Sequence, residues 1–180
     1  MKCSNPIIWR KYIKGTLRND SPLIIGSGKD DNADIQCLRD WNGDVFLPGT
    51  ALAGVLRNWL TERQENTNFV DKVFGEQKDN GRQSLLVFHD SYLKKQDERE
   101  QNNRITIRDG VALGKETKTA EDGKKYDYEI IELGQEFDFR VEIAVRKNDI
   151  EGKDPDRKNF ISDVENLMDK MFNDMASGHV

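Results

Sequence analysis

The feature that most constrains the fold is an apolar stripe with helical spacing between extended segments. Five apolar residues fall at i, i+3, i+4, i+7 and i+8: Leu52, Val55, Leu56, Trp59 and Leu60. The spacing predicts a helix near residues 51–64 with one apolar face, and Thr50 is a suitable N-cap for it. Because such a face is stable only when it is covered, the strands around it must supply a second layer.

A second apolar stripe lies near the end of the sequence. Asp154 and Pro155 suit the N-cap and N1 positions of a helix over residues 155–175. Its inner face would carry Phe160, Ile161, Val164, Leu167, Met168, Met171 and Met175. We interpret this methionine-rich face as core packing rather than as a cofactor site.

Alternating or continuous apolar segments predict strands at residues 11–18, 84–93 and 137–145. The order strand, helix, strand, insertion, strand, helix predicts the α+β class. It indicates a ferredoxin-like (RRM-like) antiparallel sheet with two helices on one face and the final strand missing. We therefore expect residues 1–180 to form a single domain that is incomplete at its C-terminus, as a fragment or one piece of a larger fusion.

The insertion between the last two strands predicts a long hairpin. Residues 105–113 and 126–133 form two extended arms joined across residues 120–125. This segment is charged and poor in apolar residues, so we expect Ile107 and Tyr126 to lie outside the main core.

Composition excludes several classes of protein. Apolar residues make up 36% of the chain and the mean hydropathy is -0.80, without a run of about 18 apolar residues. We therefore expect a soluble, cytoplasmic protein with no membrane partner. Two histidines and two separated cysteines are too few for a zinc site, so any metal would be a hard cation held by carboxylates. A net charge of -5 argues against a nonspecific nucleic-acid coat protein.

Three segments, taken in order, give the sequence a specific likeness. They are S-P-L-I-I-G-S-G at residues 21–28, then L-R-D at 38–40 with L-P-G-T-A-L-A-G-V-L-R at 47–57, and finally F-G at 74–75 with L-V-F-H-D-S-Y-L at 86–93. Together they resemble the RAMP superfamily, and most closely the repeating backbone subunit of type III CRISPR effector complexes. Each segment alone is weak, but their order and spacing are specific.

The resemblance implies an RNA-binding surface at the glycine-containing segments. Gly26, Ser27 and Gly28 would belong to it, as would the turn at Pro48, Gly49 and Thr50. That turn places backbone N–H groups at the start of a helix, which suits a phosphate. An ordinary capped helix is the alternative. Arg57 could reach a phosphate, and a salt-bridged arginine is an equal alternative.

In this family the guide RNA lies along stacked subunits, and a hairpin thumb interrupts the guide–target duplex. The resemblance places the thumb at residues 104–133. Six cationic residues give this segment basic character: Arg104, Arg108, Lys115, Lys118, Lys124 and Lys125. We expect Arg104 and Arg108 to contact RNA. A merely solvated insertion is the alternative.

The resemblance also implies a catalytic residue. Active members carry an aspartate six residues before the aspartate of the R-D pair, and that position is Asp34 here. Asp34 would hold Mg²⁺ or another divalent cation with Asp30 and Asp31, or position the RNA ribose for attack by its 2′-hydroxyl. Asp40 begins a turn and is expected to be structural.

Three functions therefore follow from the sequence. The first is an RNA-guided, metal-dependent endoribonuclease subunit that acts only in the assembled complex, with guide RNA, target RNA and other RAMP subunits as partners. The second is a non-catalytic scaffold that binds guide RNA. The third is a ferredoxin-like interaction domain without RNA.

Overall fold

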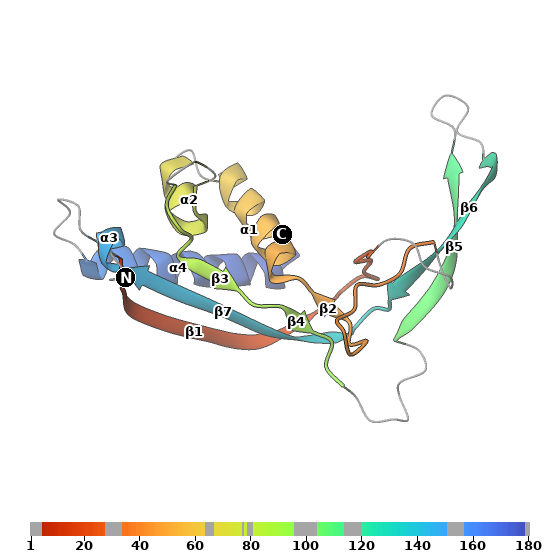
Figure 1. Cartoon of the computed structure of the whole chain (residues 1–180), viewed down its shortest axis with the longest axis horizontal. Coiled ribbons are helices and arrows are strands. Elements are labelled where there is room, and N and C mark those ends of the chain that lie inside the picture. The colour runs from red at the N-terminus through yellow and green to blue at the C-terminus, as the bar shows by residue number, and fades with distance from the viewer. Residues whose placement is uncertain are drawn as a thin grey trace. The chain divides into compact units, whose positions relative to one another are not determined.

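The computed structural model describes residues 5–27, 34–63, 67–76, 78, 81–95, 104–113, 120–150 and 157–178. The elements follow one another as β1 (Ile7–Arg18), β2 (Phe46–Leu47), α1 (Gly49–Arg63), α2 (Thr67–Phe74), β3 (Leu86–Phe88), β4 (Ser91–Tyr92), β5 (Ile105–Leu113), β6 (Ala120–Ile131), β7 (Glu136–Arg146), α3 (Lys147–Ile150) and α4 (Arg157–Ala176) (Figure 1). No helix among these residues is long and apolar enough to cross a bilayer.

The chain separates into two compact units. The first comprises the described residues within Met1–Lys14, Pro48–His89 and Arg140–Val180, and the second those within Gly15–Leu47 and Asp90–Phe139. We call them the helical unit and the hairpin unit. That residues 1–180 form one domain stays a prediction.

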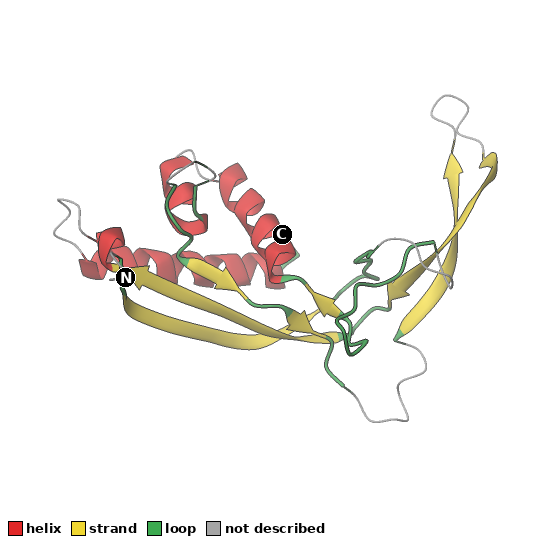
Figure 2. Ribbon diagram, in the orientation of Figure 1, coloured by secondary structure: helices red, strands yellow, loops and turns green. Residues whose placement is uncertain are grey.

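The helical unit is built on a three-stranded sheet in the order β1-β7-β3. Strand β3 is antiparallel to β7, with Leu86 opposite Ile143. Alternate residues of β7 are buried (Val141, Ile143 and Val145), which is the pattern of a sheet with one covered face. Figure 2 shows the helices of this unit on one side of these strands.

Both apolar stripes contribute to the core. Residues Leu56, Trp59 and Leu60 of α1 are buried, as are Val164, Leu167, Met168 and Met171 of α4. The indole N–H of Trp59 donates to Asp174 of α4 at 3.1 Å. Val55 was predicted to belong to the apolar stripe, but its side chain is 55% exposed and lies outside the core. Asp154 and Pro155, predicted to begin the second helix, lie outside the described residues.

Helix α1 begins two residues earlier than predicted, at Gly49. The carbonyl oxygen of Pro48 accepts hydrogen bonds from the N–H groups of Ala51 and Leu52, at 3.0 and 3.2 Å. Pro48 therefore occupies the N-cap position, and the expectation that Thr50 caps the helix was wrong. Gly49 is buried against the next strand, where a Cβ atom would stand 2.1 Å from the carbonyl oxygen of Phe88.

The hairpin unit contains the predicted hairpin. Strands β5 and β6 pair antiparallel from Ile105 opposite Ile131 to Leu113 opposite Ala120, so the second arm begins earlier than expected (Figure 1). Ile107 is 56% exposed and Tyr126 37% exposed, which confirms that neither is packed in a core.

The strand predicted at residues 84–93 is two short strands. Strand β3 pairs with β7, whereas β4 pairs with β2, with Phe46 opposite Tyr92. His89 and Asp90 stand between them and belong to neither strand. An apolar run does not reveal such a change of partner, because both segments are extended.

Two glycines of α1 test how closely the helix start approaches β3. Gly49→Ala should destabilise the protein by about 1–3 kcal/mol, because the new methyl group meets backbone atoms that cannot move away easily. Gly54→Ala is the matched control. A Cβ at position 54 meets nothing within 4 Å, so alanine should stabilise the helix by about 0.5–1 kcal/mol. Urea unfolding of both variants measures the difference, and equal effects would contradict the packing described here.

Candidate functional site

The segment that carries the predicted catalytic aspartate lies along strand β6. The Ile35 N–H donates to the Asp127 carbonyl at 3.1 Å, and the Glu129 N–H donates to the Ile35 carbonyl at 2.8 Å. Leu23 and Ile131 exchange two further backbone bonds, at 2.9 and 2.8 Å. Backbone pairing of this kind fixes the segment in one register against the hairpin.

Arg39 of the R-D pair binds the same strand through its side chain. Its Nη1 and Nη2 atoms lie 3.2 and 3.1 Å from the two carboxylate oxygens of Glu129, a two-pronged ion pair. Glu129 also accepts the Cys37 N–H at 2.8 Å. Burial of the Cys37 thiol, with the negative charge of Glu129 beside it, raises its pKa to about 11. This cysteine is therefore a packing residue rather than a nucleophile.

Asp34 stands at the start of this segment, next to two hairpin carboxylates. Its Oδ2 atom accepts the Asp127 N–H at 3.3 Å. Asp127 lies directly opposite Asp109 in the hairpin register. Partial withdrawal of the Asp127 carboxyl from water, followed by the negative charges of Asp109 and Asp34, raises its pKa. Like charges paired across strands are destabilising, so this part of the hairpin is electrostatically strained.

Asp40 has the structural role expected from the sequence. Its Oδ1 atom accepts the N–H groups of Asn42 and Asp44, at 2.9 and 3.0 Å, which closes the turn after the R-D pair. Trp41 in this turn is 91% exposed.

The other predicted site residues lie in both units. In the hairpin unit the Ser27 N–H donates to the Gln36 carbonyl at 2.9 Å, and a Cβ on Gly26 would stand 2.9 Å from Ile35 Cγ2. These two residues therefore lie against Ile35 and Gln36. Gly28, Asp30 and Asp31 lie outside the described residues.

In the helical unit Pro48, Gly49 and Thr50 begin α1 as described above. Arg57, on the same helix, donates to the Gly75 carbonyl at 2.8 Å and pairs with Asp71 at 2.6 Å. The salt-bridged alternative for Arg57 is thus what the structure contains, and its contact with RNA stays a prediction.

Arg104 and Arg108 occupy the β5 side of the hairpin. The Nε of Arg104 donates to Gln135 at 2.8 Å, and burial lowers the pKa of this guanidinium. The Nη2 of Arg108 donates to both carboxylate oxygens of Glu132, at 2.9 and 3.0 Å. Hydrogen bonds from Thr106 and then from Arg108 lower the pKa of the Glu132 carboxyl.

Within the described ranges, no group of three or more histidine, cysteine, aspartate or glutamate residues is arranged to hold a metal ion. Of the predicted metal ligands only Asp34 is described, so a site shared with Asp30 and Asp31 stays a prediction. Carboxylates are the donors that Mg²⁺ prefers, and this donor set suits such an ion chemically.

Sequence reasoning missed Asp109, Asp127 and Glu129, which surround the segment of Asp34 and Arg39 in the structure. The hairpin register could have found the first two, since they face one another across it. Nothing in the sequence connects Arg39 to a glutamate 90 positions away.

Comparison with known proteins identifies the family of the chain. The family model of the RAMP superfamily matches residues 16–179, and the chain belongs to that superfamily. A search of curated proteins found no match.

Solved structures of similar fold include a chain of the type III-B Cmr-beta complex bound to cognate target RNA, with a TM-score of 0.61 and 11% identity over 79% of this chain and 86% of that one. A chain of the same complex in its apo state gives a TM-score of 0.59 and 11% identity, over 74% and 84%.

The strained carboxylates provide a test of the hairpin geometry. The carboxyl of Asp127 has a higher pKa in the folded protein than in the unfolded chain, where it is 3.8, so its ionisation destabilises the fold. This loss of stability begins as the pH rises through 3.8 and is complete once the pH exceeds the raised pKa. Asp127→Asn should therefore raise the melting temperature at pH 7, and this gain should disappear at pH 3, where both states are protonated. Thermal melts at the two pH values measure it. Asp138→Asn, on an exposed residue of β7, is the charge-matched control. A gain for Asp127→Asn that does not change with pH would contradict the carboxylate cluster.

Proposed function

We propose that this protein is a backbone subunit of a type III CRISPR ribonucleoprotein, which binds guide RNA and cleaves paired target RNA. Membership of the RAMP superfamily and the fold shared with type III-B chains support the class of complex. The observation that carries the cleavage is the placement of Asp34 on the hairpin, in the register set by β6. Guide RNA, target RNA and other RAMP subunits are the partners.

The proposed core is ferredoxin-like. Strands β1, β3 and β7 would be its first, second and third strands, and α1 and α4 its two helices. The sheet order β1-β7-β3 supports this, because the third strand of that arrangement lies between the first and the second.

Guide binding would rest on phosphate contacts from Arg104, Arg108 and the glycine-containing segments. Such contacts position RNA without reading its sequence, which suits a guide of variable sequence. Arg108 is fixed by Glu132 and Arg104 by Gln135, so both guanidiniums are oriented before RNA arrives. A preorganised donor loses less conformational freedom on binding.

Cleavage would proceed by attack of the target's own 2′-hydroxyl on the neighbouring phosphorus. The new P–O2′ bond forms as the P–O5′ bond breaks, the 2′-hydroxyl loses its proton to solvent and O5′ takes one up, which leaves a 2′,3′-cyclic phosphate and a 5′-hydroxyl. Asp34 would accept a hydrogen bond from the 2′-hydroxyl and orient it. The Asp127 N–H donates to one oxygen of the Asp34 carboxylate, and this hydrogen bond restricts the rotamer of Asp34.

A divalent cation fits the chemistry of this site. Asp34, Asp30 and Asp31 would hold it, and Asp109 and Asp127 add negative charge nearby. When bound, it would supply Lewis-acid stabilisation of charge on the phosphoryl oxygens.

Asp34→Ala should reduce target cleavage by at least about 100-fold while guide binding and assembly stay unchanged, because the carboxylate acts on the reacting group. The measurement is single-turnover cleavage of a complementary RNA by purified complexes that contain the variant. Asp34→Asn is the stricter variant. It keeps an oxygen that can accept the Asp127 N–H, and it should be equally inactive.

Asp40→Ala is the control. It removes the acceptor of two turn N–H groups, so it should cost about 1 kcal/mol of stability and leave the cleavage rate of folded complexes intact. If the Asp34 variants cleave at the wild-type rate, the subunit is a guide-binding scaffold and its complex cuts elsewhere. If no RNA copurifies with the wild-type complex, the interaction domain without RNA is the better account.

A further inference from the structure

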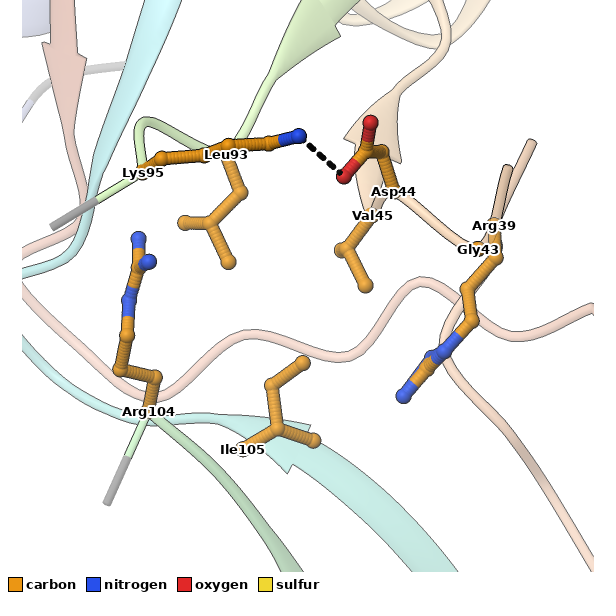
Figure 3. Close-up of a pocket in the computed structure, with 8 residues that line it drawn as sticks. All are labelled: Arg39, Gly43, Asp44, Val45, Leu93, Lys95, Arg104 and Ile105. Atoms are coloured by element: carbon orange, nitrogen blue, oxygen red, sulfur yellow. Dashed lines mark ion pairs between the residues drawn. The ribbon is translucent and has the colours of Figure 1, made fainter. Parts of the chain in front are cut away.

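The hairpin unit contains an open pocket that the proposed cleavage step does not use. Its volume is about 390 Å³. Figure 3 shows three apolar side chains around its centre and three cationic side chains near its edge: Val45, Leu93, Ile105, Arg39, Lys95 and Arg104. The pocket therefore combines an apolar floor with a cationic rim.

The charges of the pocket favour an anion. Asp44 is the only carboxylate among the described residues that line it, and it pairs with Lys95 at 3.2 Å. Arg39 is paired with Glu129, which lies outside the lining, so the lining carries one excess positive charge, that of Arg104, although the whole chain has a net charge of -5. An anion placed at the rim would be attracted by this local excess.

Arg104 retains donors for such an anion. A guanidinium has five N–H groups. The Nε of Arg104 donates to Gln135 and its Nη2 to the Lys94 carbonyl, and Nη1 has no acceptor among the described residues. No carboxylate of the described chain forms an ion pair with Arg104, and its burial disfavours the uncompensated charge. A phosphate oxygen would supply the missing counter-charge.

We propose that this pocket binds one nucleotide, with its phosphate on Arg104 and Lys95 and its ribose or base over Val45, Leu93 and Ile105. The two ligand parts match the rim and the floor. A residue of the guide RNA and a free mononucleotide share this chemistry. The first source rests on the proposed function, and the second does not.

Trp41 gives the pocket an optical reporter. Its side chain is 91% exposed, and it lies two residues from both Arg39 and Gly43, which line the pocket. A nucleotide base bound beside this turn should quench the indole by stacking or contact.

The experiment uses the full chain, a fluorescein-labelled decamer of uridine and, separately, AMP. Binding is followed by anisotropy for the RNA and by tryptophan fluorescence for AMP. Lys95→Gln is the test variant because Lys95 is 80% exposed and its loss should not unfold the chain. Lys11→Gln is the matched control: it removes the same charge from an exposed lysine that also forms one ion pair, with Glu165 of α4.

For the ligand that occupies the pocket, Lys95→Gln should weaken binding roughly two- to tenfold, whereas Lys11→Gln should not change it. Arg104→Lys, which keeps the charge but loses the planar donor set, should weaken the same ligand. For RNA, Lys95→Gln should also reduce the slope of the logarithm of the binding constant against the logarithm of the salt concentration, by the amount expected for about one phosphate contact.

The two sources give different results. RNA binding that depends on Lys95 identifies an RNA residue as the occupant, and AMP binding that depends on Lys95 identifies a free nucleotide. The proposal is overturned if neither probe binds, or if the lysine variants weaken binding equally. If the pocket proposal is overturned in this way but complexes with Lys95→Gln cleave target RNA at the wild-type rate, the proposed function still stands. Lys95-dependent AMP binding without copurifying RNA would retain the pocket and reject the proposed function.

Discussion

Glu129 is the residue on which the position of the candidate catalytic aspartate depends. Its backbone N–H binds Ile35, and its carboxylate binds both the guanidinium of Arg39 and the N–H of Cys37. Because the pair is half-buried, removing Glu129 leaves the Arg39 charge and the Cys37 N–H without this counterpart, which costs more than the loss of a surface ion pair. With the segment held this way, Asp34 comes to the start of its pairing with β6, where it meets the Asp127 N–H.

The same arrangement collects negative charge. Asp109 and Asp127 face each other in the hairpin, and Asp34 adds a third carboxylate nearby. Hairpins ordinarily avoid like charges in opposed positions, since they reduce stability. Departures from such local rules are concentrated at functional sites. The opposed carboxylates therefore support the proposed position of the cleavage chemistry.

Much of the fold follows from short-range patterns. The helical spacing of Leu56, Trp59 and Leu60 predicted α1, and the charged composition of residues 105–133 predicted an exposed hairpin. The prediction that Val55 is buried was wrong because a stripe predicts the apolar face of a helix but not the edges of that face, which depend on what packs opposite. The prediction of one strand at residues 84–93 was wrong because an extended run does not specify its pairing partners. Similarly, Asp34 could be named from the family resemblance through its spacing to Asp40. Glu129 could not, since its contact with Arg39 joins residues 90 positions apart and exists only in the folded chain.

The central claim is that Asp34 orients a 2′-hydroxyl of the target RNA for attack on its own phosphodiester. The most direct measurement uses a target with a single 2′-deoxy nucleotide at the scissile position, cleaved by the wild-type complex, with the products of the all-ribose target analysed by mass spectrometry. The account predicts no cleavage at the deoxy position, and a 2′,3′-cyclic phosphate and a 5′-hydroxyl at each cut in the all-ribose target. Cleavage of the deoxy target at the normal rate, with a 5′-phosphate on the product, would contradict it.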